Sequence, residues 1–264
     1  MRRALLAALL VVAAVGSTVS GSLVSAAAAQ DQQPYPWAKR AASAGKFAKA
    51  RSGRVSWAVV DPGGHVRGQS IHARHRSASV VKAMLLVAYL NHGDVPRRPL
   101  RGNEKGFLRP MIVRSDNGAA SHTFGIVGQS GLQRLGRRVR MKDLGTSPAW
   151  GSTQISPYDQ TRFFYRLDSF VPRRHRAYAR SLLSSIVADQ RWGLPPAVPS
   201  GWRIYFKGGW LPPRVVNQVG LLERGDKRIA IAVFTAGDPS FVYGQKTIQG
   251  VAQRLLLRLN DFAL

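Results

Sequence analysis

The chain has 264 residues without a cysteine, and its 39 Lys and Arg against 13 Asp and Glu give a formal net charge of +26. The absence of thiols excludes disulfides, thiol catalysis and cysteine-based metal sites. So positive a field attracts anionic partners. For an exported chain the expected partners are anionic cell-envelope polymers or lipid surfaces, not nucleic acid. Any single cluster of Arg residues can also be a solvated helix face that binds no partner.

Residues 1–30 have the pattern of a secretory signal peptide. Arg2 and Arg3 precede an uncharged apolar stretch, and the small residues at 26–29 suit a signal peptidase. We therefore expect a signal peptide over 1–29, cleavage near Ala29 and a secreted, extracytoplasmic protein. An uncleaved membrane anchor is the alternative, because an apolar span of about 20 residues can cross a bilayer.

The remaining chain is long enough for one large domain with its own core. A helix is expected over 37–51, and a strand hairpin then occupies 55–60 and 65–71. A run of apolar residues on all sides predicts a buried helix over 80–90. Four further helical segments are expected at 107–114, 131–138, 157–167 and 174–187.

Strand character returns only near the end of the chain. The expected strands are 202–206, 215–222 and 228–235, and a helix over 246–259 closes the chain. This order predicts an α+β fold (an α/β sandwich), in which an antiparallel sheet built from both chain ends is flanked by helices. Within a single domain over 30–264, the sheet lobe would comprise about 37–78 and 201–264, and an inserted helical lobe about 79–200.

A Ser-x-x-Lys pair opens the buried helix. Ser79 and Lys82 are three residues apart, so on a helix they share one face and the amine can take the hydroxyl proton. A helix start also directs backbone N–H groups and the positive end of the dipole at Ser79. Spacing alone is weak evidence, because Ser43 and Lys46 have the same spacing by coincidence.

Two further short motifs follow in the chain. Ser115-Asp116-Asn117 comes after the helical segment 107–114 and is expected in a turn or helix corner. Lys207-Gly208-Gly209 comes after the expected strand 202–206. Alone, the first is an ordinary capping tripeptide and the second an ordinary strand end.

In this order and placement, the three motifs resemble the class A β-lactamase and penicillin-binding protein superfamily, whose signature set is Ser-x-x-Lys, Ser-Asp-Asn and Lys-Thr-Gly. The resemblance runs from about Trp37 to the C-terminus. It implies a serine hydrolase that acts on amide bonds without a metal or cofactor. The chain has Gly208 where the family motif has Thr.

The resemblance also implies the roles of the catalytic residues. Ser79 would attack a carbonyl and become acylated, and Lys82 in its neutral form would act as base or orienter. A like charge on Lys207 would help to lower the pKa of Lys82. Ser115 would relay a proton between the lysine pair and the leaving nitrogen.

The same resemblance implies how the substrate is held. Asn117 would bind its amide side chain, and Lys207 and Gly209 would border it along the late strand. The backbone N–H groups of Ser79 and Trp210 would form the oxyanion hole. The family's Thr hydroxyl helps to hold a substrate carboxylate, so Gly208 removes one contact to a β-lactam or D-alanyl terminus. Whether Arg214 or another Arg replaces that contact is left open by the sequence.

A second departure concerns release of the acyl group. Class A enzymes use a Glu between the second and third motifs to activate water, but Glu104 and Glu223 both lie outside that interval. The four acidic residues inside it are Asp143, Asp159, Asp168 and Asp189. Asp159 fits a helix start at Ser156-Pro157-Tyr158-Asp159 better than a catalytic role, so slow turnover is expected.

The expected function is that of a monomeric, β-lactamase-like serine hydrolase that opens β-lactam amides. A D-alanyl-D-alanine carboxypeptidase or penicillin-binding enzyme is one alternative, and a catalytically impaired cell-wall-binding module of the same fold is another. A Ser-His-Asp hydrolase is disfavoured, because 128–131 lacks the final Gly of a nucleophile elbow. His72 and His75 lack a third metal ligand at sensible spacing.

Overall fold

A five-stranded antiparallel sheet forms the centre of the protein in the computed structural model, which describes residues 33–212 and 214–264. The strand order is β2-β1-β7-β6-β5. The strands are β2 (Val66–Gln69), β1 (Arg54–Val60), β7 (Lys227–Ala236), β6 (Val215–Arg224) and β5 (Arg203–Leu211). The sheet is therefore assembled from both ends of the chain, as the sequence predicts, and β5 lies at its edge.

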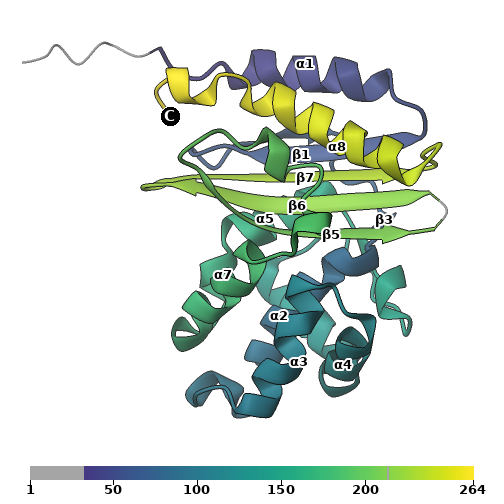
Figure 1. Cartoon of the computed structure of the whole chain (residues 1–264), viewed down its shortest axis with the longest axis vertical. Coiled ribbons are helices and arrows are strands. Elements are labelled where there is room, and N and C mark those ends of the chain that lie inside the picture. The colour runs from purple at the N-terminus through teal and green to yellow at the C-terminus, as the bar shows by residue number, and fades with distance from the viewer. Residues whose placement is uncertain (1–32, 213) are drawn as a thin grey trace, which may run out of the picture. The chain divides into compact units, whose positions relative to one another are not determined.

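Helices cover both faces of the sheet (Figure 1). On one face α1 (Trp37–Lys49) packs against α8 (Phe241–Leu256), and α8 in turn packs on β6 and β7. The other face carries the remaining helices α2 (Val81–Leu90), α3 (Gly102–Val113), α4 (Asn117–Val139), α5 (Pro157–Tyr165), α6 (Leu167–Phe170) and α7 (Arg176–Ser184). Because both faces are covered, consecutive residues of β1 and β7 are buried. The expected α+β fold is confirmed.

Three helices begin earlier than the sequence predicts. The start of α3 depends on Glu104, whose side chain accepts a hydrogen bond from the backbone N–H of Arg101 at 2.6 Å. At α8 the cap is Ser240, whose Oγ accepts a hydrogen bond from Tyr243 N at 3.1 Å. Capping therefore lets α3 and α8 begin a turn or more before the apolar residues from which each helix is predicted.

The third early start is that of α4, which begins at Asn117 although only 131–138 was predicted. Gly128 interrupts it with φ 65° and ψ 176°, a backbone conformation that glycine adopts without strain. The glycines of this segment lower its helix propensity, and packing against α2 and α3 overrides that preference.

A second, two-stranded sheet joins the approach to Ser79 to the segment before α5. It pairs β3 (His75–Arg76) with β4 (Gln154–Ile155), and Ser77 N donates to Thr153 O at 2.7 Å. The loop that contains Trp150 is thereby fixed beside the chain that leads into Ser79.

The predicted signal peptide and its cleavage near Ala29 lie outside the described residues. Within 33–212 and 214–264, none of the helices has both the length and the apolar character needed to cross a bilayer.

Candidate active site

Ser79 lies in a short 3-10 turn, η1 (Ala78–Val80), which leads directly into α2. The sequence predicts a helix start here, and the structure differs only in the tighter first turn. Ala78 has φ 48°, and such left-handed backbone in a non-glycine residue costs about 1 to 3 kcal/mol. Ser79 is partly exposed and lines a cavity of about 560 Å³.

Lys82 is fully buried in α2, one turn after Ser79. Its Nζ donates to Ser115 O at 2.5 Å, to Asn117 Oδ1 at 2.8 Å and to Ser115 Oγ at 3.2 Å. The hydrogen bonds of this amine in the described structure thus go to the second motif rather than to Ser79. The structure brings the first two motifs together through Lys82.

Ser115 lies at the corner between α3 and α4, where Asp116 caps α4 by accepting a hydrogen bond from Ala119 N at 2.7 Å. The φ of Ser115, 58°, is again left-handed. Lys207 Nζ, from β5, donates to Ser115 Oγ at 3.0 Å and to Gly208 O at 2.9 Å. With two lysines donating to its oxygen, the Ser115 hydroxyl keeps its own proton available for a substrate atom.

Burial lowers the pKa of both lysines. The pKa of Lys82 falls to about 8, mainly through desolvation, while the charge of Asp116 opposes the shift. The pKa of Lys207 falls well below its ordinary value, through complete burial first and the charge of Lys82 second. Desolvation is thus the main cause for both lysines, and the expected lowering of the pKa of Lys82 by the charge of Lys207 stays a prediction.

The edge strand β5 passes directly beside the Ser79 backbone. A Cβ added to Gly209 would lie 2.4 Å from Ser79 N and 2.7 Å from Val80 N, so only glycine permits this approach. Trp210 follows, lines the same cavity and is 37% exposed. Ser79, Ser115, Asn117 and Trp210 thus share one cavity, while Lys82 and Lys207 meet at Ser115 and Gly209 contacts Ser79.

Among the described residues, no acidic side chain lines this cavity. Glu104 pairs with Arg98 and Glu223 with Arg180, away from the cavity. Three of the four Asp side chains between the second and third motifs also bind partners elsewhere: Asp143 binds His72 and Ser156, Asp159 binds two backbone N–H groups, and Asp168 binds Arg180. Ser156 Oγ caps α5 by accepting from Asp159 N at 3.2 Å, which agrees with the capping role predicted for this segment. Asp189 is exposed.

An aromatic ring lies beside Lys82. Lys82 Nζ is 4.9 Å from the ring centroid of Trp150, a residue that lines the cavity from the loop before β4. Sequence reasoning missed Trp150, because no motif contains it. An indole face can stabilise an ammonium group but offers no base to a water molecule.

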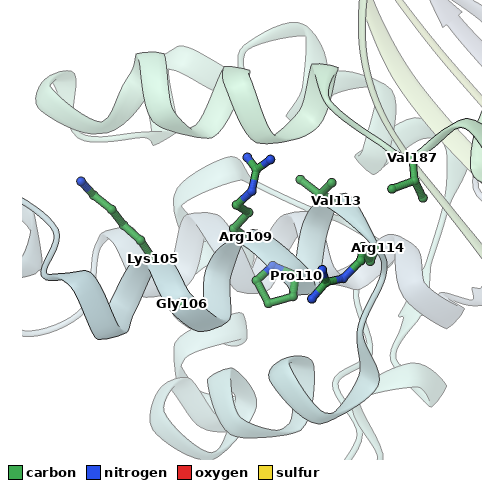
Figure 2. Close-up of a pocket in the computed structure, with 7 residues that line it drawn as sticks. All are labelled: Lys105, Gly106, Arg109, Pro110, Val113, Arg114 and Val187. Atoms are coloured by element: carbon green, nitrogen blue, oxygen red, sulfur yellow. The ribbon is translucent and has the colours of Figure 1, made fainter.

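Two cations of the cavity also escaped the sequence analysis. Arg76 and Arg114 line it, whereas Arg214 is exposed outside it. Arg114 also borders a second cavity, of about 400 Å³, along α3 (Figure 2). Figure 2 shows Lys105 and Arg109 extending from the same side of α3 there. Such cations were visible in the sequence only as part of its large charge.

The other candidates of the sequence lie apart from this cavity. Ser43 and Lys46 belong to α1, on the opposite face of the sheet. His72 pairs with Asp143, whereas His75 is buried against Ser56 Oγ at 3.0 Å, and burial lowers its pKa to about 3. Within the described ranges, no group of three or more His, Cys, Asp or Glu side chains could hold a metal ion.

Comparison with solved structures shows the same fold in proteins of low sequence identity. A β-lactamase from Sphaerobacter thermophilus superposes with a TM-score of 0.74 at 22% identity, over 87% of this chain and 100% of that chain. PBP-A gives a TM-score of 0.72 at 15% identity, over 86% and 98%. An ancestral class A β-lactamase gives 0.69 at 17% identity, over 83% and 99%. A search of curated protein sequences found no match.

A family model described as the β-lactamase enzyme family matches residues 105–259. The matched segment is more than half of the chain and contains Ser115, Asn117 and Lys207, while Ser79 and Lys82 precede it. It confirms the resemblance that the three motifs predict. The chain belongs to the β-lactamase enzyme family.

Proposed function

We propose that this protein is an exported serine hydrolase that forms an acyl-enzyme on Ser79, as a β-lactamase-like or penicillin-binding enzyme does. The observation that carries the proposal is the convergence of Lys82 Nζ and Lys207 Nζ on Ser115 Oγ, at 3.2 and 3.0 Å, beside a cavity lined by Ser79. Two lowered pKa values and a nucleophile at one cavity are typical of an active site.

In the proposed reaction, Ser79 Oγ attacks the substrate carbonyl carbon and its proton passes to neutral Lys82. With a pKa of about 8, about one tenth of Lys82 is neutral at pH 7. The bond from the carbonyl carbon to the leaving atom then breaks, and the Ser115 hydroxyl gives its proton to that atom. The lysine pair returns a proton to Ser115.

Backbone groups would stabilise the charge that develops on the carbonyl oxygen. We assign this oxyanion hole to the N–H groups of Ser79 and Trp210. The close approach of Gly209 to Ser79 N supports the assignment, because it brings β5 against the turn that carries the nucleophile. Asn117 Oδ1 accepts from Lys82, so its amide NH₂ is oriented toward other partners.

Release of the acyl group is proposed to be slow. In the described structure the cavity has no carboxylate lining it, and the Trp150 ring, which offers no base, lies beside Lys82. This observation favours a penicillin-binding or carboxypeptidase-like role as the second candidate. The cations Arg76 and Arg114 at the cavity, with Lys105 and Arg109 beyond, support binding to anionic envelope polymers.

Labelling with a fluorescent penicillin and with a fluorophosphonate tests the proposed nucleophile. We expect one adduct per chain, mapped to Ser79 by peptide mass spectrometry, and no adduct in Ser79→Ala. In Lys82→Ala the labelling rate should fall about a hundredfold or more, because the base is lost. The matched control is Ser43→Ala, whose Ser-x-x-Lys pair lies on α1 and which should label normally. Absence of an adduct with both probes would contradict the proposal.

A pair of adjacent glycine substitutions tests the oxyanion hole. In Gly209→Ala the new Cβ meets the backbone of Ser79, so β5 must move away and acylation should slow by about a hundredfold. In Gly208→Ala the new Cβ meets side chains, Trp192 at 3.1 Å and Gln218 Nε2 at 3.5 Å, rather than the backbone of Ser79, and the rate of penicillin labelling should stay within about threefold. Stopped-flow labelling measures the acylation rate of both variants, and thermal melts verify that both are folded. Equal acylation rates in the two variants would contradict the assigned oxyanion hole.

The lifetime of the penicillin adduct tests the deacylation step. Because a carboxylate base is lacking among the described residues of the cavity, we expect the adduct to persist for hours after free penicillin is removed. Intact-protein mass spectrometry at intervals measures its decay. Loss of the adduct within minutes would contradict slow release and would instead indicate an efficient β-lactamase.

A further inference from the structure

An aromatic ring lies against Gly208, the position at which the family motif has Thr. A Cβ added to Gly208 would lie 3.1 Å from Cη2 and 3.2 Å from Cζ2 of Trp192. The resemblance implies a hydroxyl for a substrate carboxylate at this position, whereas here a side chain would meet the indole ring. Gly208 is therefore part of an altered substrate contact, and the alteration includes a residue far from any motif.

Trp192 belongs to a cluster of three aromatic side chains, defined here as Trp192, Trp210 and Phe241. The ring centroids are 6.3 Å apart for Trp192 and Trp210, 5.6 Å for Trp192 and Phe241, and 5.4 Å for Trp210 and Phe241. Trp210 and Phe241 are each 37% exposed. Exposed aromatic groups that adjoin a catalytic cavity are typical of a ligand subsite.

The polypeptide holds this aromatic cluster in place. Gln218, fully buried and paired with Gly208 across β5 and β6, donates from Nε2 to Trp192 O at 2.8 Å and accepts at Oε1 from Leu194 N at 2.6 Å. Phe241 is the first residue of α8, fixed by the Ser240 cap. These hydrogen bonds hold the backbone at Trp192 and Phe241, and the rings contact one another.

Lys207, the lysine of the third motif, does not favour an anion beside the aromatic cluster. Lys207 is fully buried, and its hydrogen bonds go to Ser115 Oγ and to its neighbouring carbonyl at Gly208. Complete burial lowers its pKa well below the ordinary value. The Trp192 indole thus lies beside Gly208, where the family motif has Thr, and the Lys207 amine is hydrogen-bonded to Ser115.

The subsite lies on the leaving side of the scissile bond. In the proposed reaction Ser115 protonates the leaving atom, and Lys207, which donates to Ser115, immediately precedes Gly208 on β5. A group attached to the leaving atom therefore extends along 207–211 toward Trp210. Trp210 lines the cavity that contains Ser79.

From this geometry we infer that Trp192, Trp210 and Phe241 form a subsite for a planar, uncharged ring on the leaving group of the acyl substrate, in the place where relatives bind a carboxylate. The inference rests on the proposed function, because the proposed reaction defines which side of the scissile bond carries the leaving group. It narrows the substrate to amides or esters whose leaving group carries an aryl or similar flat ring.

Three matched thioesters test the subsite. They share one acylglycyl group, and their leaving thiols are mercaptoacetic acid, its N-methyl amide and its anilide. The leaving thiols are closely related, and division by each hydroxide-catalysed rate removes the remaining difference in reactivity. We expect the second-order acylation rate of the anilide to exceed that of the N-methyl amide at least tenfold, with the free acid no faster than the N-methyl amide.

Two single substitutions in the aromatic cluster should abolish this preference. In Trp192→Ala and in Phe241→Ala the ratio of the anilide rate to the N-methyl amide rate should fall to within about threefold of one. The matched control is Leu257→Ala, which removes a 51% exposed apolar side chain just past the far end of α8 and should leave the ratio unchanged.

Calorimetric binding of the intact thioesters to Ser79→Ala separates the subsite from the chemistry. Tighter binding of the anilide than of the N-methyl amide, lost in Ser79→Ala/Phe241→Ala, supports the subsite even if wild-type protein forms no acyl-enzyme. Equal rates and equal affinities for these two thioesters would overturn it. A tenfold preference for the free acid that disappears in Arg114→Gln would also overturn it, because the carboxylate would then bind at Arg114.

Discussion

Two lysine side chains removed from water beside a single hydroxyl are the constraint on which this site depends. Burying an unpaired ammonium group is strongly unfavourable, and the protein reduces that cost in two ways. Burial lowers both pKa values, and the three hydrogen bonds of Lys82 Nζ direct it to Ser115 and Asn117. In the proposed reaction the same arrangement supplies a base, a proton donor and a path for the proton between them.

Three distant parts of the chain must meet for this arrangement to exist. Helix α2 supplies Lys82, the corner between α3 and α4 supplies Ser115, and β5 supplies Lys207. The left-handed φ values of Ala78 and Ser115 store strain at this meeting point. The packing of Gly209 on Ser79 N completes it. The edge strand β5 pairs with β6 along its whole length, which positions Lys207 and Gly209.

Much of the fold could be predicted from the sequence, because the apolar patterns of β1, β6, β7 and α2 are strong and local. The early start of α4 could not be predicted, since its glycines oppose a helix and only packing against α2 and α3 overrides them. The three motifs identified the residues that meet at Ser115. Trp150, Trp192 and Phe241 were missed, because their roles arise from loops and helix ends that tertiary packing places beside the cavity.

The proposed acylation uses groups that the cavity brings together, whereas the described residues that line the cavity include no carboxylate for release of the acyl group. The proposed subsite for the leaving group is aromatic. The pH dependence of the second-order rate constant for acylation of Ser79 tests this account most directly. With neutral Lys82 as the proposed base, the rate should rise with pH and reach half its maximum at about pH 8. A rate that does not change between about pH 6 and about pH 10, or one that still rises at the ordinary pKa of lysine, would contradict it.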